Sequence, residues 1–183
     1  MSDAKRTSIH HFIEHTVNPN AARQAHAYAH ATPHILLIFD ASGCVTRSDL
    51  AVLRSMASSI LVDVKAEVSL VCVNHRADLA TPYDPSTSSA PAGEPADPQC
   101  ARDIDMLGVL AERLCDADDH YDGIVVMTEG KFLPFSAQAL QDAVAHHRPG
   151  SGQAALPPIG FFQFSSGAIP SEPAYVLTRH VAL

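Results

Sequence analysis

The apolar run at residues 35–39, which ends in an aspartate, constrains the fold more than any other feature of the sequence. In "HILLIFDASGC" the apolar residues are continuous rather than alternating. This pattern is typical of a strand that is covered on both faces, as in a parallel sheet. It predicts a strand over His34–Phe39, with Asp40 at its tip and a turn of small residues after it. A carboxylate in that position needs a partner or a ligand.

The rest of the chain predicts helices and strands in alternation. Helices are expected at 8–30, 46–61, 103–115 and 136–147, and further strands at 67–73, 123–128, 159–164 and 175–179. Such alternation predicts an α/β fold, a three-layer doubly wound Rossmann-like domain with a mostly parallel central sheet. We divide the chain into an N-terminal helical, His-rich segment at 1–33 and the α/β domain at 34–183.

Residues 78–99 have a different composition. The stretch "DLATPYDPSTSSAPAGEPADPQ" holds five prolines among Ser, Ala and Gly. Such a stretch cannot form a regular helix or a central strand. A loop of this length within a compact domain is uncommon and is usually functional, so we expect it to make contacts near the site.

Composition excludes several classes of function. The formal net charge is −8 and the Lys and Arg residues are not clustered, which argues against a nucleic-acid surface. The sequence shows neither a signal-peptide pattern nor an apolar run of membrane-spanning length. The four cysteines are far apart and form no CxxC motif. We therefore expect a cytoplasmic protein that binds neither nucleic acid nor membrane.

Two polar loops follow strands of the predicted sheet. "DASGC" (40–44) follows the first strand and "TEG" (128–130) follows the strand at 123–128. Ligands bind outside the carboxyl ends of such strands, so Asp40, Ser42 and Glu129 are expected to converge there. Their oxygen atoms suit Mg²⁺ or Ca²⁺. A plainer interpretation is that Asp40 only caps the helix that starts nearby.

These loops carry a resemblance to a known family. "IFDASGC-VTRSDL" resembles the DxSxS loop and following helix of a von Willebrand factor A (VWA) domain, whose metal ion-dependent adhesion site (MIDAS) uses an Asp and two Ser from this loop. "GIVVMTEG" is similar to the second acidic loop of that family, usually Thr-Asp-Gly. "QCARDIDMLGVL" stands where the family places a Thr at a helix start, with Arg102 at that position and Asp103 after it. The similarity spans about residues 34–165 and is nearest to the short bacterial VWA-like domains.

Three departures from the family pattern predict a degenerate MIDAS. Cys44 replaces the second Ser, and a thiol is a poor ligand for a hard cation. Glu129 replaces the Asp. Arg102 would place a permanent positive charge where the ion sits and would neutralise the carboxylates without metal. No cofactor is therefore expected; if the site still functions, Mg²⁺ would be held by Asp40, Ser42 and Glu129.

The resemblance implies a non-enzymatic protein–protein interaction module, an adaptor or assembly subunit of a complex. Its partner would be a protein, in some members of the family an AAA+ ATPase. We expect docking through the loops at the carboxyl edge of the sheet, with the following candidate residues: Asp40, Ser42, Cys44, Arg102, Asp103 and Glu129.

Two alternatives are enzymatic. "FDASGCVT" also resembles the haloacid dehalogenase loop FDxDGTxT, which would make the chain a metal-dependent phosphatase-type hydrolase with Asp40 as nucleophile. Ser42 stands where that family needs a general acid/base, and a serine cannot carry that proton near neutral pH. A serine hydrolase lacks its GxSxG elbow here.

The histidines allow a zinc interpretation. His11 and His15 are four residues apart, as are His26, His30 and His34, and an i,i+4 pair on a helix can chelate zinc. Pro33 argues against a helix that continues to His34. The simpler interpretation is a solvated or partner-facing helix.

Overall fold

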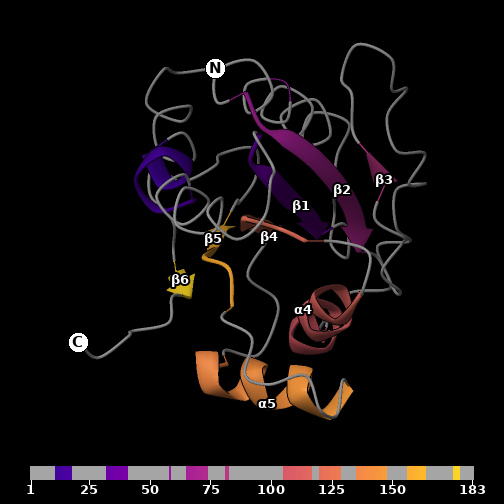
Figure 1. Cartoon of the computed structure of the whole chain (residues 1–183). Helices are drawn as coiled ribbons and strands as arrows, with labels where there is room; N and C mark the ends of the chain where they lie inside the picture. Colours follow the sequence, from indigo (N-terminus) through magenta and orange to yellow (C-terminus); the bar gives the residue numbers. More distant parts are fainter. Residues whose placement is uncertain are drawn as a thin grey trace, which may run out of the picture.

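The structure, a computed structural model, describes ten parts of the chain. They are 11–17, 32–40, 58, 65–73, 81–82, 105–116, 120–128, 135–147, 156–163 and 175–177. At 81–82, 163 and 175–177 the structure describes the backbone and not the side chains. The strands in these parts form one six-stranded sheet in the order β3-β2-β1-β4-β5-β6 (Figure 1). The strands are β1 (His34–Asp40), β2 (Glu67–Val73), β3 (Thr81–Pro82), β4 (Gly123–Thr128), β5 (Ile159–Gln163) and β6 (Tyr175–Leu177).

The four inner strands are parallel, as the continuous apolar runs predict. β1 pairs with β2 along one edge and with β4 along the other, and β4 pairs in turn with β5. β3 and β6 pair antiparallel at the two outer edges. The α/β class and a mostly parallel sheet are therefore confirmed.

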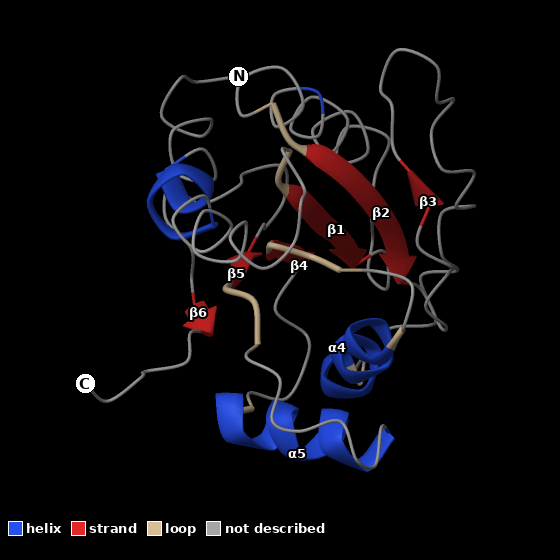
Figure 2. Ribbon diagram, in the orientation of Figure 1, coloured by secondary structure: helices blue, strands red, loops and turns tan. Residues whose placement is uncertain are grey.

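One face of the sheet packs against two helices, α4 (Met106–Cys115) and α5 (Ala137–His147) (Figure 2). Side chains alternate along a strand, and every second residue of β1 points to these helices. Leu36 and Ile38 are fully buried there, in one cluster with Leu110 of α4 and Leu140 of α5. Full burial of such a side chain contributes about 1.5–3 kcal/mol, so this layer supplies a large part of the core.

The opposite face carries the N-terminal turn η1 (Ile13–Val17) and the residues just before it. The Phe12 ring packs edge-on against Phe162 of β5, with centroids 5.9 Å apart. A Cβ atom at Gly123 would lie 2.5 Å from Cγ2 of Val17. The glycine therefore lets the N-terminal segment approach β4 closely.

In both helices a side-chain oxygen of the residue just before the first helical residue caps the first turn. The Asp105 carboxylate accepts a hydrogen bond from the backbone N–H of Gly108 at 2.9 Å. The Ser136 hydroxyl accepts one from Ala139 at 3.1 Å. Such caps satisfy free N–H groups of the first turn. They also correct the predicted helix starts, 103 and 136, to Met106 and Ala137.

The strand at Thr81–Pro82 was not predicted, since it lies in the Pro-rich stretch 78–99. It is an edge strand of two residues, and an edge position tolerates proline because no N–H is needed on the outer side. The predicted helix at 46–61 lies outside the described residues except for Ser58, which is helical. None of the helices in the described part of the chain is long and apolar enough to cross a lipid bilayer.

Packing at Gly123 gives a test of the N-terminal layer. Gly123→Ala should destabilise the fold by about 1–3 kcal/mol, because its methyl group would overlap Val17. The free energy of unfolding in urea measures this change. In the double variant Gly123→Ala, Val17→Ala the two effects should be strongly non-additive, since the smaller side chain makes room for the methyl group. Additive effects would show that residues 11–17 do not cover β4.

Candidate functional site

The candidate site lies at the carboxyl ends of β1 and β4. The two strands are neighbours, with Phe39 opposite Met127, so the next residues, Asp40 and Thr128, end their strands side by side. Alternation puts Asp40 on the same face as Leu36 and Ile38, towards α4 and α5. The sequence thus brings a carboxylate and a hydroxyl together at the rim of the core.

Asp40 and Thr128 form a buried hydrogen-bonded pair. The Thr128 hydroxyl donates to Oδ2 of Asp40 at 2.5 Å. Asp40 is 0% exposed and Thr128 is 1% exposed. Hydrogen bonds from a hydroxyl to a carboxylate are short and about twice as strong as those between neutral groups. The pair therefore joins two central strands through their side chains as well as their backbones.

Burial makes this carboxylate dependent on its partners. Moving a charged carboxylate out of water costs several kcal/mol unless hydrogen bonds or an opposite charge replace the lost hydration. Thr128 supplies one such hydrogen bond. A carboxylate at the end of a core strand therefore depends on the groups that end the neighbouring strands.

Carboxylate and hydroxyl oxygens are ligands that Mg²⁺ and Ca²⁺ accept, so the donor chemistry of Asp40 and Thr128 fits a hard cation. The other residues predicted for the site lie outside the described part of the chain: Ser42, Cys44, Arg102, Asp103 and Glu129. Glu129 follows Thr128 directly in the sequence. Within the described residues, no three His, Cys, Asp or Glu side chains are grouped so that they could hold a metal ion.

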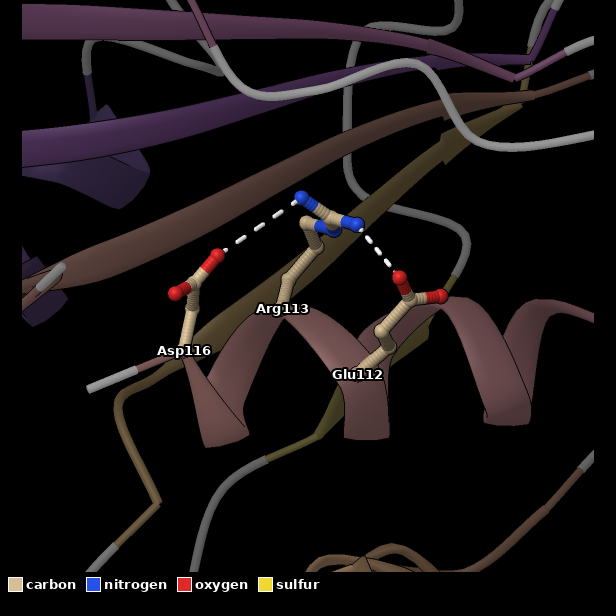
Figure 3. A network of polar contacts seen from close by, with 3 residues as sticks. All are labelled: Glu112, Arg113 and Asp116. Carbon is tan, nitrogen blue, oxygen red and sulfur yellow. Dashed lines mark hydrogen bonds and ion pairs between the residues drawn. The ribbon is translucent and has the colours of Figure 1, made fainter. Parts of the chain in front are cut away.

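The buried arginine that the structure describes is Arg113, in the last turn of α4. Its guanidinium lies on the side of the helix towards the strands, flanked by two carboxylates (Figure 3). Its NH2 donates to Glu112 at 2.7 Å, and its NH1 lies 3.9 Å from Asp116. Its Nε is buried without a hydrogen-bond partner. Two carboxylates neutralise this charge, so Arg113 does not create an anion site.

The structure corrects the zinc interpretation at His34. This residue is the first of β1 and not part of a helix, because Pro33 and the apolar run that follows favour extended backbone. It therefore cannot share a helix face with His26 and His30, which lie outside the described residues. The rings of His11 and His15 do lie close together, with centroids 4.2 Å apart.

Sequence reasoning assigned no role to Thr128, the direct partner of Asp40. The predicted strand 123–128 already ended at this residue, which is the last residue of β4. A signal was present, since a hydroxyl ends an otherwise apolar strand, "GIVVMT". Its register against Asp40 could not be read from the sequence alone.

Comparisons with known proteins give no further identification. The chain matches no protein-family model, and no curated protein or solved structure matches it.

Replacing Thr128 tests the pair. Thr128→Val keeps the shape and removes the hydroxyl, so buried Asp40 loses a hydrogen bond and the fold should lose about 1–3 kcal/mol. Thr128→Ser keeps the hydroxyl and should lower the free energy of unfolding by distinctly less than Thr128→Val does. Both values come from urea unfolding. If Val and Ser were equally destabilising, the hydrogen bond would not contribute to the stability.

Proposed function

We propose that this chain is a protein–protein interaction module with a VWA-like fold, an adaptor or assembly subunit that docks a protein through the carboxyl edge of its sheet, and that this edge is non-enzymatic. The observation that carries the proposal is the buried Asp40–Thr128 pair at that edge. It holds a charged group beside the two loops that the resemblance assigns to partner binding. Apolar residues at these two positions would stabilise the core as well as the buried polar pair does.

The strand order supports a doubly wound, Rossmann-like arrangement. From β1 the chain adds β2 and β3 on one side of the sheet, and it adds β4, β5 and β6 on the other side. The order of strands therefore changes side between β1 and β4. In open α/β sheets, ligands bind outside the carboxyl ends of the strands at such a switch point. Asp40 and Thr128 are the last residues of these two strands, so the general rule for this class of sheet favours the same edge.

Asp40 and the docking residues have separate tasks in this proposal. Because Asp40 is 0% exposed, it does not itself present a surface to a protein. Its task is to anchor the loop that follows β1. The contacts with the partner fall to the loop residues Ser42, Cys44 and Glu129 and to the segment with Arg102 and Asp103.

We place no metal ion in the native site. Ser42 and Glu129 retain oxygen ligands, whereas Cys44 offers sulfur and Arg102 brings a positive charge. The guanidinium would satisfy Asp40 and Glu129 in place of an ion. Docking then depends on shape and charge of the loops, and not on an ion shared with the partner.

A phosphatase of the haloacid dehalogenase type is the competing function for Asp40. A nucleophilic carboxylate has to reach its substrate, and Asp40 is fully buried with one oxygen bound to Thr128. These contacts favour an anchoring role. Hydrolysis of p-nitrophenyl phosphate by the wild-type chain that is lost in Asp40→Asn would establish the phosphatase instead.

Restoring the family pattern tests the degenerate site. We expect Mg²⁺, Mn²⁺ and Ca²⁺ to leave the thermal unfolding midpoint of the wild-type chain unchanged. The triple variant Cys44→Ser, Arg102→Thr, Glu129→Asp should gain a Mg²⁺-dependent rise, because an ion at one hundred times its Kd stabilises by about 2.7 kcal/mol. Adding Asp40→Asn should abolish this gain. A wild-type shift that Asp40→Asn removes would show that the native site binds metal.

Affinity capture tests the docking edge. The chain is immobilised and retained proteins are identified by mass spectrometry, with Ser42→Arg, Glu129→Arg as the loop variant and Ala145→Arg, His147→Arg as the matched control. Ala145 and His147 are exposed in the last turn of α5, and the chain enters this helix from β4 at its other end. We expect the partner to be retained by wild type and control and to be lost from the loop variant. Identical protein sets from all three baits would refute docking at this edge.

A further inference from the structure

A second polar cluster lies at the opposite, amino end of the sheet. His34 begins β1, Ser69 lies in β2, and residues 120–122 lead into β4. Ser69 is in register with Leu36, so His34 and Ser69 lie on the same face of the sheet. At about 3.3 Å per residue, the six steps along β1 separate this cluster from Asp40 by roughly 20 Å.

The His34 ring is bound at both nitrogens. Nδ1 lies 3.0 Å from the backbone oxygen of His120, and Nε2 lies 2.8 Å from Oγ of Ser69. A carbonyl oxygen can only accept, so Nδ1 carries the proton. In the neutral ring Nε2 is then the acceptor, and the Ser69 hydroxyl donates to it. The partners thus fix the tautomer in which the imidazole can take the serine proton.

Three further contacts hold the His34 ring and backbone. The Asp122 carboxylate accepts the backbone N–H of His34 at 2.9 Å, and the Asp122 N–H donates to the His34 oxygen at 2.8 Å. The Tyr121 ring lies against the imidazole, with centroids 4.9 Å apart. A base that is oriented by a third group, and bonded to a hydroxyl, is the arrangement that activates serine nucleophiles.

We propose that Ser69 is a nucleophile activated by His34, and that it accepts acyl groups from small uncharged esters. This site is separate from the one around Asp40 and does not depend on the proposed docking function. The His120 carbonyl takes the role of the orienting acceptor.

The reaction proceeds in balanced steps. The Ser69 oxygen attacks the ester carbonyl while Nε2 of His34 takes the hydroxyl proton. The carbon–oxygen bond to the alcohol breaks, the alcohol leaves with that proton, and the acyl group stays on Ser69. Nε2 then takes a proton from water as the water oxygen attacks the acyl carbon. The bond from that carbon to Oγ of Ser69 breaks and Nε2 returns the proton to Oγ, so that the carboxylic acid is released and the serine is restored.

Burial and charge define the substrate class. Ser69 is 6% exposed and His34 is half-buried, so the acyl group has to be small. Glu67, the register partner of His34, is exposed on the same face, and Asp122 adds a second carboxylate. These charges repel anionic substrates, which leaves short uncharged esters as the class that fits.

Covalent labelling tests the proposal. The full-length chain is treated with phenylmethylsulfonyl fluoride, a small uncharged reagent that transfers its sulfonyl group to an activated serine with loss of fluoride. Peptide mapping by mass spectrometry should find Ser69 labelled in the folded chain and unlabelled in urea. A folded wild-type chain without label at Ser69 would overturn the proposal, and this result requires no variant.

Variants then separate activation from exposure. His34→Gln should slow labelling of Ser69 by about one hundredfold or more, because a general base supplies a factor of this size. The exposed cap residue Ser136 provides the control, since Ser136→Ala should label Ser69 at the wild-type rate. The release of p-nitrophenol from p-nitrophenyl acetate should show a burst that Ser69→Ala abolishes. Equal labelling rates in wild type and His34→Gln, with unchanged unfolding midpoints, would refute activation by His34.

Discussion

Strand β1 is the element on which the rest of the structure depends. It pairs with a parallel strand along each of its edges. Its residues from Ile35 to Phe39 are at most 1% exposed. Because all backbone groups of such a strand must be satisfied within the sheet, its neighbours are fixed once β1 is buried. The helices on one face and the N-terminal segment on the other then have defined apolar surfaces to cover.

The two ends of β1 carry the polar chemistry of the described residues. Asp40 at one end binds Thr128 of β4, and His34 at the other end binds Ser69 of β2. Each bond links β1 to a different neighbour, so the side chains reinforce the strand order at both rims. An apolar strand gives such groups a low-dielectric surrounding in which hydrogen bonds are strong and unpaired groups are costly. This property makes both ends suitable for binding or reaction.

The inner strands were the most predictable elements. β2 and β4 have the bounds that their apolar runs predict, 67–73 and 123–128, because continuous burial leaves a continuous pattern. Helix starts were less predictable, because the hydrogen bonds from the first turn to Asp105 and Ser136 set the boundary and the apolar pattern does not mark it. Of the candidate site, the sequence supplied Asp40 at the strand end. It did not supply Thr128 as its partner.

The sequence by itself determined the α/β class, the four buried parallel strands and the carboxylate at the tip of the first strand. A strand that is buried on both faces has consecutive apolar residues, and this pattern can be recognised in the sequence. Only the tertiary structure decided which side chains meet. Asp40 and Thr128 are 88 residues apart, and His34 and Ser69 are 35 apart. Their contacts depend on strand order and register, which arise from the packing of the whole sheet and leave no local pattern at either residue.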